Sequence, residues 1–283
     1  NENTLYVADN LGYLYALDLD DKSVIWAKNY GISFRSNLKF INDQIFLANQ
    51  DNVIYSINSQ TGDKNWEFAT SVTFLKSDFE NNFALDIISN SVFFLNTSGE
   101  LYSINYLTQK INWVLNFKNS SLSGDTELFL GQPIVIKDNT LVITTGKSLL
   151  SYDTLTGVRN WNFIAETSIK PIITRDYTYI ILKNNLLVCL DNKKSEVIWS
   201  KNIFANIESS RIRKKFGSII DFKIVNSLIN IYSNNGYLLT FNLTSGKLLS
   251  PDRISKNGIS SEIIFINDNM LLFDEDNRLL NFN

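Results

Sequence analysis

The sequence predicts an all-β fold of about seven repeated units, each built from four short antiparallel strands. Three observations carry this prediction: a tryptophan in constant register, an Asp or Asn at a fixed position, and an alternating strand between them. Gly12 stands 14 residues before Trp26, and Asn52 stands 14 residues before Trp66. The same spacing recurs along the chain, so all five of its tryptophans share one register: Trp26, Trp66, Trp113, Trp161 and Trp199.

The sixth position of each repeat is Asp or Asn without exception. These side chains accept hydrogen bonds from the backbone two residues further on, so they open turns. Thr-Gly or a related pair follows in most repeats and supplies a residue that tolerates positive φ. The Asp and Asn residues concerned are Asp18, Asn58, Asn105, Asp153, Asp191, Asn242 and Asn283.

Alternating apolar residues precede each of these turns, as in "VIYSIN" and "LLVCLD", and predict one buried face per strand. Two further short strands lie upstream, and the repeats follow one another at 38 to 51 residues. Four strands per period of this size are typical of a β-propeller blade. We therefore expect one β-propeller domain over residues 1–283, with repeats at about 1–31, 32–70, 71–117, 118–165, 166–204, 205–254 and 255–283.

The recurrent tryptophans are interpreted as structural. A Trp just after a hairpin turn buries a large area by packing between neighbouring blades or against the hairpin. The alternative is an aromatic binding surface, but a binding site needs no copy in every blade. The repeat at Gly236 has Ser250 at the Trp position, and the last repeat ends before that position.

Composition excludes several classes of function. The net charge of −3 and the pI near 5.2 provide no electrostatic reason to expect nucleic-acid binding. The chain has no histidine, which excludes Ser-His-Asp and Cys-His catalysis and histidine-ligated zinc. Its single cysteine, Cys189, lies in an alternating strand and is expected to be a buried core thiol.

The ends of the chain support two expectations. The polar start, Asn1 to Thr4, carries no signal-peptide pattern, so the protein is cytoplasmic or a leader has been removed. The first repeat begins at its second strand and the last halts after its third, so we expect a missing N-terminal segment or imperfect closure of the ring. No apolar run approaches the roughly 20 residues that a membrane-spanning helix needs.

Two acidic clusters resemble calcium ligands. "DLDD" (18–21) and "DEDN" (274–277) both fall at turns, where Asp is expected in any case. We predict no bound metal and no cofactor.

Three insertions lengthen the connections from a Trp strand to the next repeat, at 69–83, 118–132 and 203–220. In a propeller these connections emerge on one rim, and rim loops carry function. The third insertion holds a basic run that could dock an acidic partner or form a solvated loop. Phe216, Phe74 and Phe79 are either exposed anchors or buried beneath the loops. The basic run consists of Arg211, Arg213, Lys214 and Lys215.

The repeat "GYLYALDLDDKSVIW" resembles that of PQQ-type propellers over the whole chain. Quinoprotein dehydrogenases of this type use a quinone, calcium, a catalytic Asp and, in many members, a pair of adjacent cysteines. This chain has one cysteine and no calcium motif, and it is far shorter, so we expect no catalysis and no catalytic residue.

The stretch "LYVADNLGYLYALDLDDKSVIW" and the incomplete last repeats are similar to the BamB family of outer-membrane assembly lipoproteins. That family commonly has eight blades and carries a lipid-modified cysteine after a signal peptide. The resemblance implies contact between the loop joining repeats 3 and 4 and the barrel-assembly protein BamA. The matching positions are Leu122, Asp125, Glu127 and Leu128.

From this resemblance we expect a monomeric, non-catalytic scaffold that docks proteins through rim loops. It implies a periplasmic location at the outer membrane, reached through partners or through an N-terminal lipid anchor. The alternatives are a ligand-binding or sensor propeller and, less favoured, a quinoprotein-like enzyme.

Overall fold

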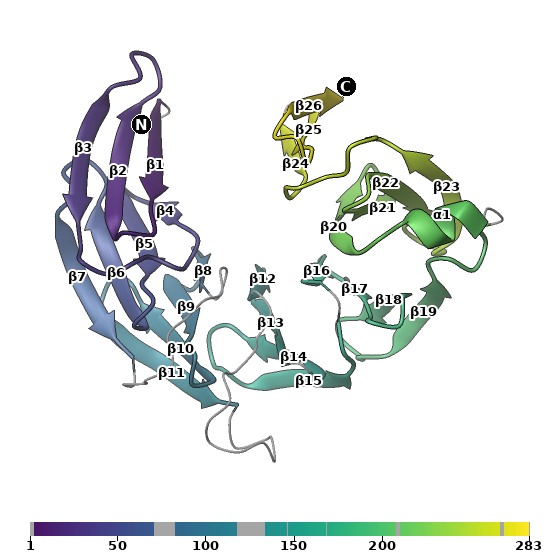
Figure 1. The fold of residues 1–283 in the computed structure, drawn as a ribbon. Helices are drawn as coiled ribbons and strands as arrows, with labels where there is room; N and C mark the ends of the chain where they lie inside the picture. The colour runs from purple at the N-terminus through teal and green to yellow at the C-terminus, as the bar shows by residue number, and fades with distance from the viewer. Residues whose placement is uncertain are drawn as a thin grey trace. The chain divides into compact units, whose positions relative to one another are not determined.

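The structure is a computed structural model of the chain (Figure 1). It forms two compact units, residues 1–162 and 163–283. The expectation of a single domain stays a prediction. The residues described are 3–70, 83–117, 134–145, 147–167, 169–207, 210–266 and 269–282.

Four antiparallel sheets carry the strands of the first unit, each with sequential strand order. The first has three strands and the other three have four. The last strand, β15, runs across the boundary into the second unit. The sheets are β1 (Thr4–Ala8), β2 (Tyr13–Asp18) and β3 (Val24–Asn29); β4 (Lys39–Ile41), β5 (Gln44–Ala48), β6 (Val53–Asn58) and β7 (Lys64–Ala69); β8 (Phe83–Asp86), β9 (Ser91–Leu95), β10 (Glu100–Asn105) and β11 (Lys110–Asn116); and β12 (Val135–Lys137), β13 (Thr140–Thr145), β14 (Ser148–Asp153) and β15 (Arg159–Ile164).

The second unit holds two four-stranded sheets, a three-stranded sheet and one short helix. Its elements are β16 (Ile172–Ile173), β17 (Tyr177–Ile181), β18 (Leu186–Asp191) and β19 (Val197–Asn202); α1 (Ser210–Lys215); β20 (Ile219–Val225), β21 (Leu228–Ser233), β22 (Tyr237–Asn242) and β23 (Leu248–Arg253); and β24 (Ile264–Ile266), β25 (Asn269–Phe273) and β26 (Leu279–Phe282). Over the described residues the chain thus forms seven antiparallel sheets, and the predicted all-β, seven-bladed propeller fold is confirmed. The predicted third-strand ending of the last repeat is also observed.

In four of the sheets the middle strands are buried on both faces, which corrects the expectation of one buried face per strand, whereas β2 and β22 keep an alternating pattern. In β6, the consecutive residues Ile54, Tyr55, Ser56 and Ile57 are all buried. Blades stack face to face, so a middle strand has a neighbouring sheet on each side. The small polar Ser56 is accommodated in this dry position because its hydroxyl donates to Gln44 Oε1 at 2.8 Å.

One hydrophobic cluster lies between each pair of consecutive sheets within a unit. Between the first two sheets it includes Leu14, Phe34 and Ile45. Between the sheets β16–β19 and β20–β23 it includes Leu187 and Phe222. The core is therefore a series of inter-sheet layers, which is the arrangement expected of radially packed blades.

The predicted turn chemistry is present in the six repeats whose turn the structure describes. Asn58 Oδ1 accepts hydrogen bonds from the backbone N–H groups of Gln60 and Thr61, at 2.9 and 3.0 Å. Four residues after each Asp or Asn, the backbone has positive φ. These positions are Lys22, Gly62, Gln109, Gly157, Ser195 and Gly246.

This turn is the surface on which the tryptophan of the preceding sheet packs. Trp26 Nε1 donates to Ser59 O at 2.9 Å, and a Cβ added to Gly62 would lie 2.7 Å from the Trp26 ring. Trp113 repeats the arrangement with Thr154 O at 3.1 Å and with Gly157. Glycine at these positions thus meets two demands, a positive φ and room for an indole ring.

A β-bulge lies beside the Trp position in the pairings β2–β3, β6–β7, β10–β11 and β18–β19. The register shifts after Ala16, opposite Trp26, and after Ser56, opposite Trp66. An extra residue at this point increases the local twist and re-aims the side chains that follow it. The bulge was not anticipated from the sequence.

We predict that Gly157→Ala destabilises the protein more than Gly31→Ala. Both glycines have positive φ, at 68° and 82°, so each substitution costs about 1–2 kcal/mol of backbone strain. Only the Gly157 substitution also places a Cβ 2.8 Å from Trp113, whereas nothing lies within 4 Å of one at Gly31. Urea unfolding measures both changes, and equal losses would show that the indole contact adds nothing.

Candidate protein-interaction site

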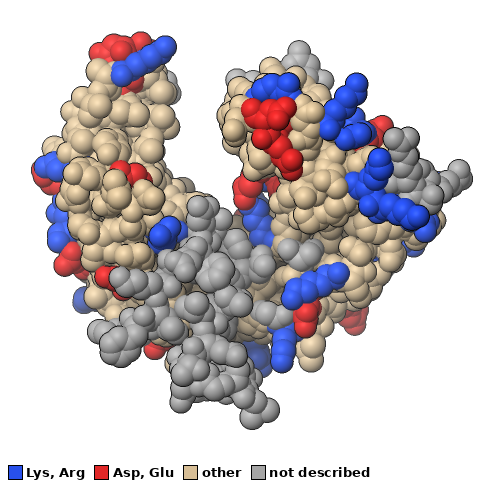
Figure 2. All heavy atoms as spheres, in the orientation of Figure 1, with Lys and Arg blue, Asp and Glu red and all other residues tan. Residues whose placement is uncertain are grey.

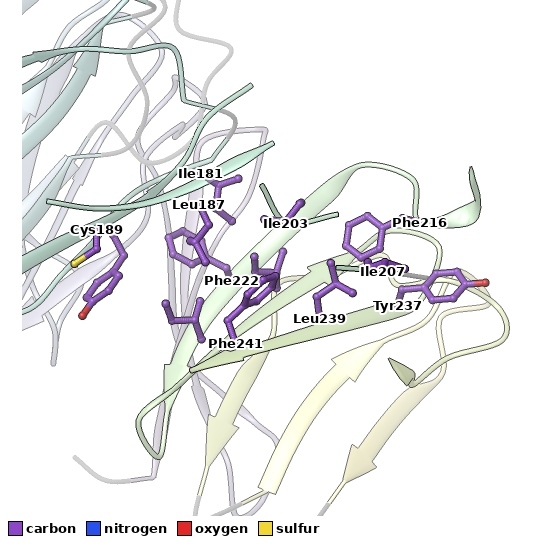
Figure 3. Packing of buried hydrophobic residues seen from close by; sticks show 13 residues of the cluster. Ile181, Leu187, Cys189, Ile203, Ile207, Phe216, Phe222, Tyr237, Leu239 and Phe241 are labelled. Atoms are coloured by element: carbon purple, nitrogen blue, oxygen red, sulfur yellow. The ribbon is translucent and has the colours of Figure 1, made fainter. Parts of the chain in front are cut away.

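The long connection from β19 to β20 contains α1 and is tied to the core by buried side chains. Ile203, Ile207 and Phe216 are each at most 2% exposed. The Phe216 ring lies 5.3 Å from the Phe204 ring and 6.3 Å from the Tyr237 ring. Figure 3 shows Phe216 beside Ile207 and Tyr237 in the cluster that joins the two sheets. The described parts of the connection, 203–207 and 210–218, are therefore packed against the second unit.

The residues of the basic run have different surroundings in the structure. The Arg213 guanidinium donates to Ile207 O at 3.0 Å and to Ala205 O at 3.4 Å, so it holds the connection together. Lys214 and Lys215 are exposed, and neither forms an ion pair with a described acidic residue. These two lysines are the ones available for docking.

Phe216 is fully buried, so the packed alternative considered for its ring is the one observed. It anchors the connection from below and presents no exposed apolar surface. The backbone of Arg211 lies in α1, and its side chain is outside the described part of the structure.

A pocket of about 420 Å³ opens beside the end of α1. Its lining includes four basic side chains and one acidic side chain, with Asn235, Tyr237, Asn257 and Gly258 completing the wall. Figure 2 shows Lys and Arg side chains in blue over the part of the second unit where Figure 1 draws α1 and β23. The charged residues of the lining are Lys214, Lys215, Arg253, Lys256 and Glu275.

Arg253, at the end of β23, is held in place by its neighbours. Its guanidinium carbon lies 5.3 Å from the centroid of the Tyr237 ring, a cation–π geometry. Its Nε and one terminal nitrogen donate to Ser255 O and Lys256 O, at 3.2 and 2.9 Å. Arg253 and Lys256 were not singled out from the sequence, because they lie about 40 residues from the basic run and no local pattern marks them.

Two amide side chains fix the pocket wall. Asn235 Nδ2 donates to Lys215 O at 2.9 Å and thereby ties the end of α1 to the turn between β21 and β22. Asn257 Nδ2 donates to Asp276 Oδ2 at 3.0 Å and ties the connection after β23 to the turn after β25. The pocket is thus bounded by four chain segments, which these two bonds join in pairs.

One arginine pairs with two of the three carboxylates in the acidic turn after β25. Arg278 Nε donates to Asp274 Oδ2 at 2.9 Å, and its terminal nitrogen also bonds Asp276 at 2.9 Å. The hydrogen bond from Arg278, with further donors from the backbone, lowers the pKa of Asp274 below its usual range. Glu275 lies between them and is the acidic residue that lines the pocket.

A second hollow, of about 730 Å³, lies along β16, β20 and β24, which are the first strands of the three sheets in the second unit. Its two lysines are both paired with carboxylates. Lys170 Nζ lies 3.1 Å from Glu262 Oε1, and Lys223 Nζ lies 3.0 Å from Asp221 Oδ2. This hollow therefore presents little net charge, in contrast to the pocket beside α1.

Several predicted contact residues fall outside the described part of the structure. These are Phe74 and Phe79 of the first insertion, and Leu122, Asp125, Glu127 and Leu128 of the second. The docking role of the four residues in the second insertion stays a prediction that rests on the family resemblance. The two alternatives for Phe74 and Phe79, exposed anchors or packed rings, stay as the sequence left them.

Three further features of the described residues concern metal binding, membrane crossing and thiol reactivity. No group of three or more His, Cys, Asp or Glu side chains there is placed to hold a metal ion. No helix among them is both long and apolar enough to cross a membrane. Cys189 is 2% exposed, and burial raises the pKa of its thiol, which disfavours the reactive thiolate.

The fold defines a β-propeller, and comparison with known proteins names the family. The family model described as "Outer membrane protein assembly factor BamB" matches residues 1–201. The chain therefore belongs to this family. No curated protein sequence matches it.

Two solved structures show the same type of fold. The crystal structure of BamB from Moraxella catarrhalis aligns with a TM-score of 0.78 at 15% identity, over 99% of this chain and 81% of that one. The computationally designed Ika8 protein aligns with a TM-score of 0.56 at 11% identity, over 100% of this chain and 93% of that one. At these identities the likeness supports the fold alone.

We predict that Phe216→Ala lowers the free energy of unfolding by about 3–5 kcal/mol, because it leaves a cavity among Phe204, Ile207 and Tyr237. Lys214→Ala, two residues away and exposed, should change it by about 0.5 kcal/mol or less. Chemical denaturation followed by tryptophan fluorescence measures both. A loss below about 1 kcal/mol for Phe216→Ala would contradict its role in the core.

A second prediction concerns acid stability. Asp274 has a lowered pKa in the folded state, so its ionised carboxylate stabilises the fold above about pH 4, the pKa expected for an Asp in the unfolded chain. This stabilisation is lost as the pH falls through the folded-state pKa. Asp274→Asn should therefore have a lower Tm than the unaltered protein at pH 7, and the gap should close in strong acid. A gap that is independent of pH would contradict this. Glu196→Gln removes an exposed carboxylate elsewhere and serves as the control.

Proposed function

We propose that this protein is a non-catalytic scaffold that docks protein partners during assembly of outer-membrane β-barrel proteins. The observation that carries the proposal is the match of residues 1–201 to the outer-membrane assembly factor family. The described residues agree with a scaffold role, since the repeated Asp, Asn, Gly and Trp side chains are used in turns and inter-sheet packing.

The proposed partner is a BamA-like barrel-assembly protein, and the proposed location is the periplasm, beside the outer membrane. The protein would act as a monomer and reach the membrane through its partners or through an N-terminal lipid anchor. Family membership supports the partner and the location.

The proposed contact surface is the rim that carries the connections between blades. On the second unit, this rim presents the exposed Lys214 and Lys215 beside a pocket with two further basic residues. The segment 118–132, with its four predicted contact residues, belongs to the same proposal through the family resemblance.

Affinity capture from an envelope extract of the source organism tests the proposal, with the chain as bait. We expect recovery of a barrel-assembly protein, identified by mass spectrometry. Replacement of 118–132 by a Gly-Ser linker of equal length should abolish recovery. Replacement of the whole of 203–220 is unsuitable, because it would remove the buried Ile203, Ile207 and Phe216.

A matched control replaces residues 192–195 of the β18–β19 turn with Gly and Ser, retaining Asp191, which caps the turn. Recovery should persist with this variant. If a folded wild-type bait recovers no barrel-assembly protein, the scaffold proposal is wrong.

The enzyme alternative has a separate readout. Pyrroloquinoline quinone and calcium, added to the purified protein and followed by gel filtration, should leave no quinone absorbance in the protein fraction. Quinone that co-elutes at a stoichiometric ratio would favour a cofactor-binding function instead.

A further inference from the structure

The pocket beside α1 gathers positive charge in a chain whose net charge is −3. Lys214 and Lys215 approach it from α1, and Arg253 and Lys256 approach it from the end of β23 and the connection that follows. Like charges placed around one cavity repel each other, so this arrangement does not stabilise the fold. It does favour a negatively charged ligand, whose attraction to the four cations is strengthened by the concave surface.

Within the described residues, no acidic group pairs with the three lysines of the pocket. The nearby Asp274 and Asp276 are occupied by Arg278, at 2.8 and 2.9 Å. Glu275 alone contributes negative charge to the lining, which leaves the cations in excess.

The orientation of Arg253 argues against a phosphate group as the ligand. Phosphate recognition commonly uses the guanidinium fork in a bidentate manner. Here the Nε side of the guanidinium already donates to Ser255 O and Lys256 O, so fewer of its five N–H groups remain for a phosphate. The lysines remain as flexible point charges, which suit separate carboxylates spaced along a ligand.

Glu275 also favours a peptide over a phosphate. A carboxylate at the pocket repels a phosphate, which carries nearly two negative charges near neutral pH. The same carboxylate can accept backbone N–H groups, which an extended peptide carries and a phosphate lacks. A volume of about 420 Å³ suits a few side chains rather than a whole domain.

We propose that this pocket binds an acidic peptide segment of a protein partner, with its carboxylates on Lys214, Lys215 and Lys256 and its backbone on Glu275. Arg253, stacked on Tyr237, shapes the floor and adds positive potential. This inference rests on the proposed function, because it names the chemistry of one docking contact of the scaffold.

Fluorescence anisotropy with two labelled decapeptides tests the inference. One carries Asp and Glu at four positions among Gly and Ser, and the other carries Asn and Gln at the same positions. We expect the acidic peptide to bind more tightly, with an affinity that falls as salt rises. The double variant Lys214→Glu, Lys215→Glu should weaken binding of the acidic peptide at least about tenfold, because it reverses two contacting charges.

Lys193→Glu with Lys194→Glu is the matched control. It makes the same charge change on exposed lysines of the β18–β19 turn, at the opposite end of the strands, and should alter affinity less than about twofold. Circular dichroism and Tm establish that both double variants fold.

Three results would overturn the inference: equal binding of the two peptides, equal weakening by the two double variants, or binding of inorganic phosphate or phosphatidylglycerol vesicles through Lys214 and Lys215 without peptide binding. The scaffold proposal is judged separately, by recovery of the barrel-assembly protein with the unaltered chain. Persistent recovery together with peptide failure would reject this pocket alone.

Discussion

The contact between an indole ring and the turn of the following sheet is the constraint on which the rest of the structure depends. Trp26 and Trp113 each donate a hydrogen bond to a turn carbonyl and lie against a glycine, Gly62 or Gly157. A single sheet cannot bury both of its faces. The contact joins the last strand of one sheet to a turn of the next sheet, while the inter-sheet clusters fill the space between the faces of the two sheets.

Because of this contact, the two ends of the strands have different roles. The turns between third and fourth strands receive the tryptophans, so their length, capping residue and positive φ hardly vary. The connections between sheets emerge at the other end and meet no such demand. They can lengthen without loss of packing, as the α1 connection does, and this freedom places the candidate interaction site on that rim.

The pocket beside α1 shows how a stable scaffold can hold a charged site. Buried Phe216 and the Arg213 hydrogen bonds fix the connection, and Arg278 pairs with both neighbouring aspartates. Lys214 and Lys215 are therefore presented on a fixed base, where docking costs little ordering of the backbone. Because they lie outside the core, they can change without affecting the fold.

The sequence by itself determined the strands, the turn residues and the number of repeats, because hydrogen bonding and φ at a turn are local properties of residues such as Asn58 and Gly62. Only the tertiary structure decided that the middle strands of four sheets are buried on both faces, that Phe216 lies in the core, and that Arg253 joins Lys214 at one pocket. Those outcomes depend on packing between sheets and on segments distant in the chain, which no local spacing encodes.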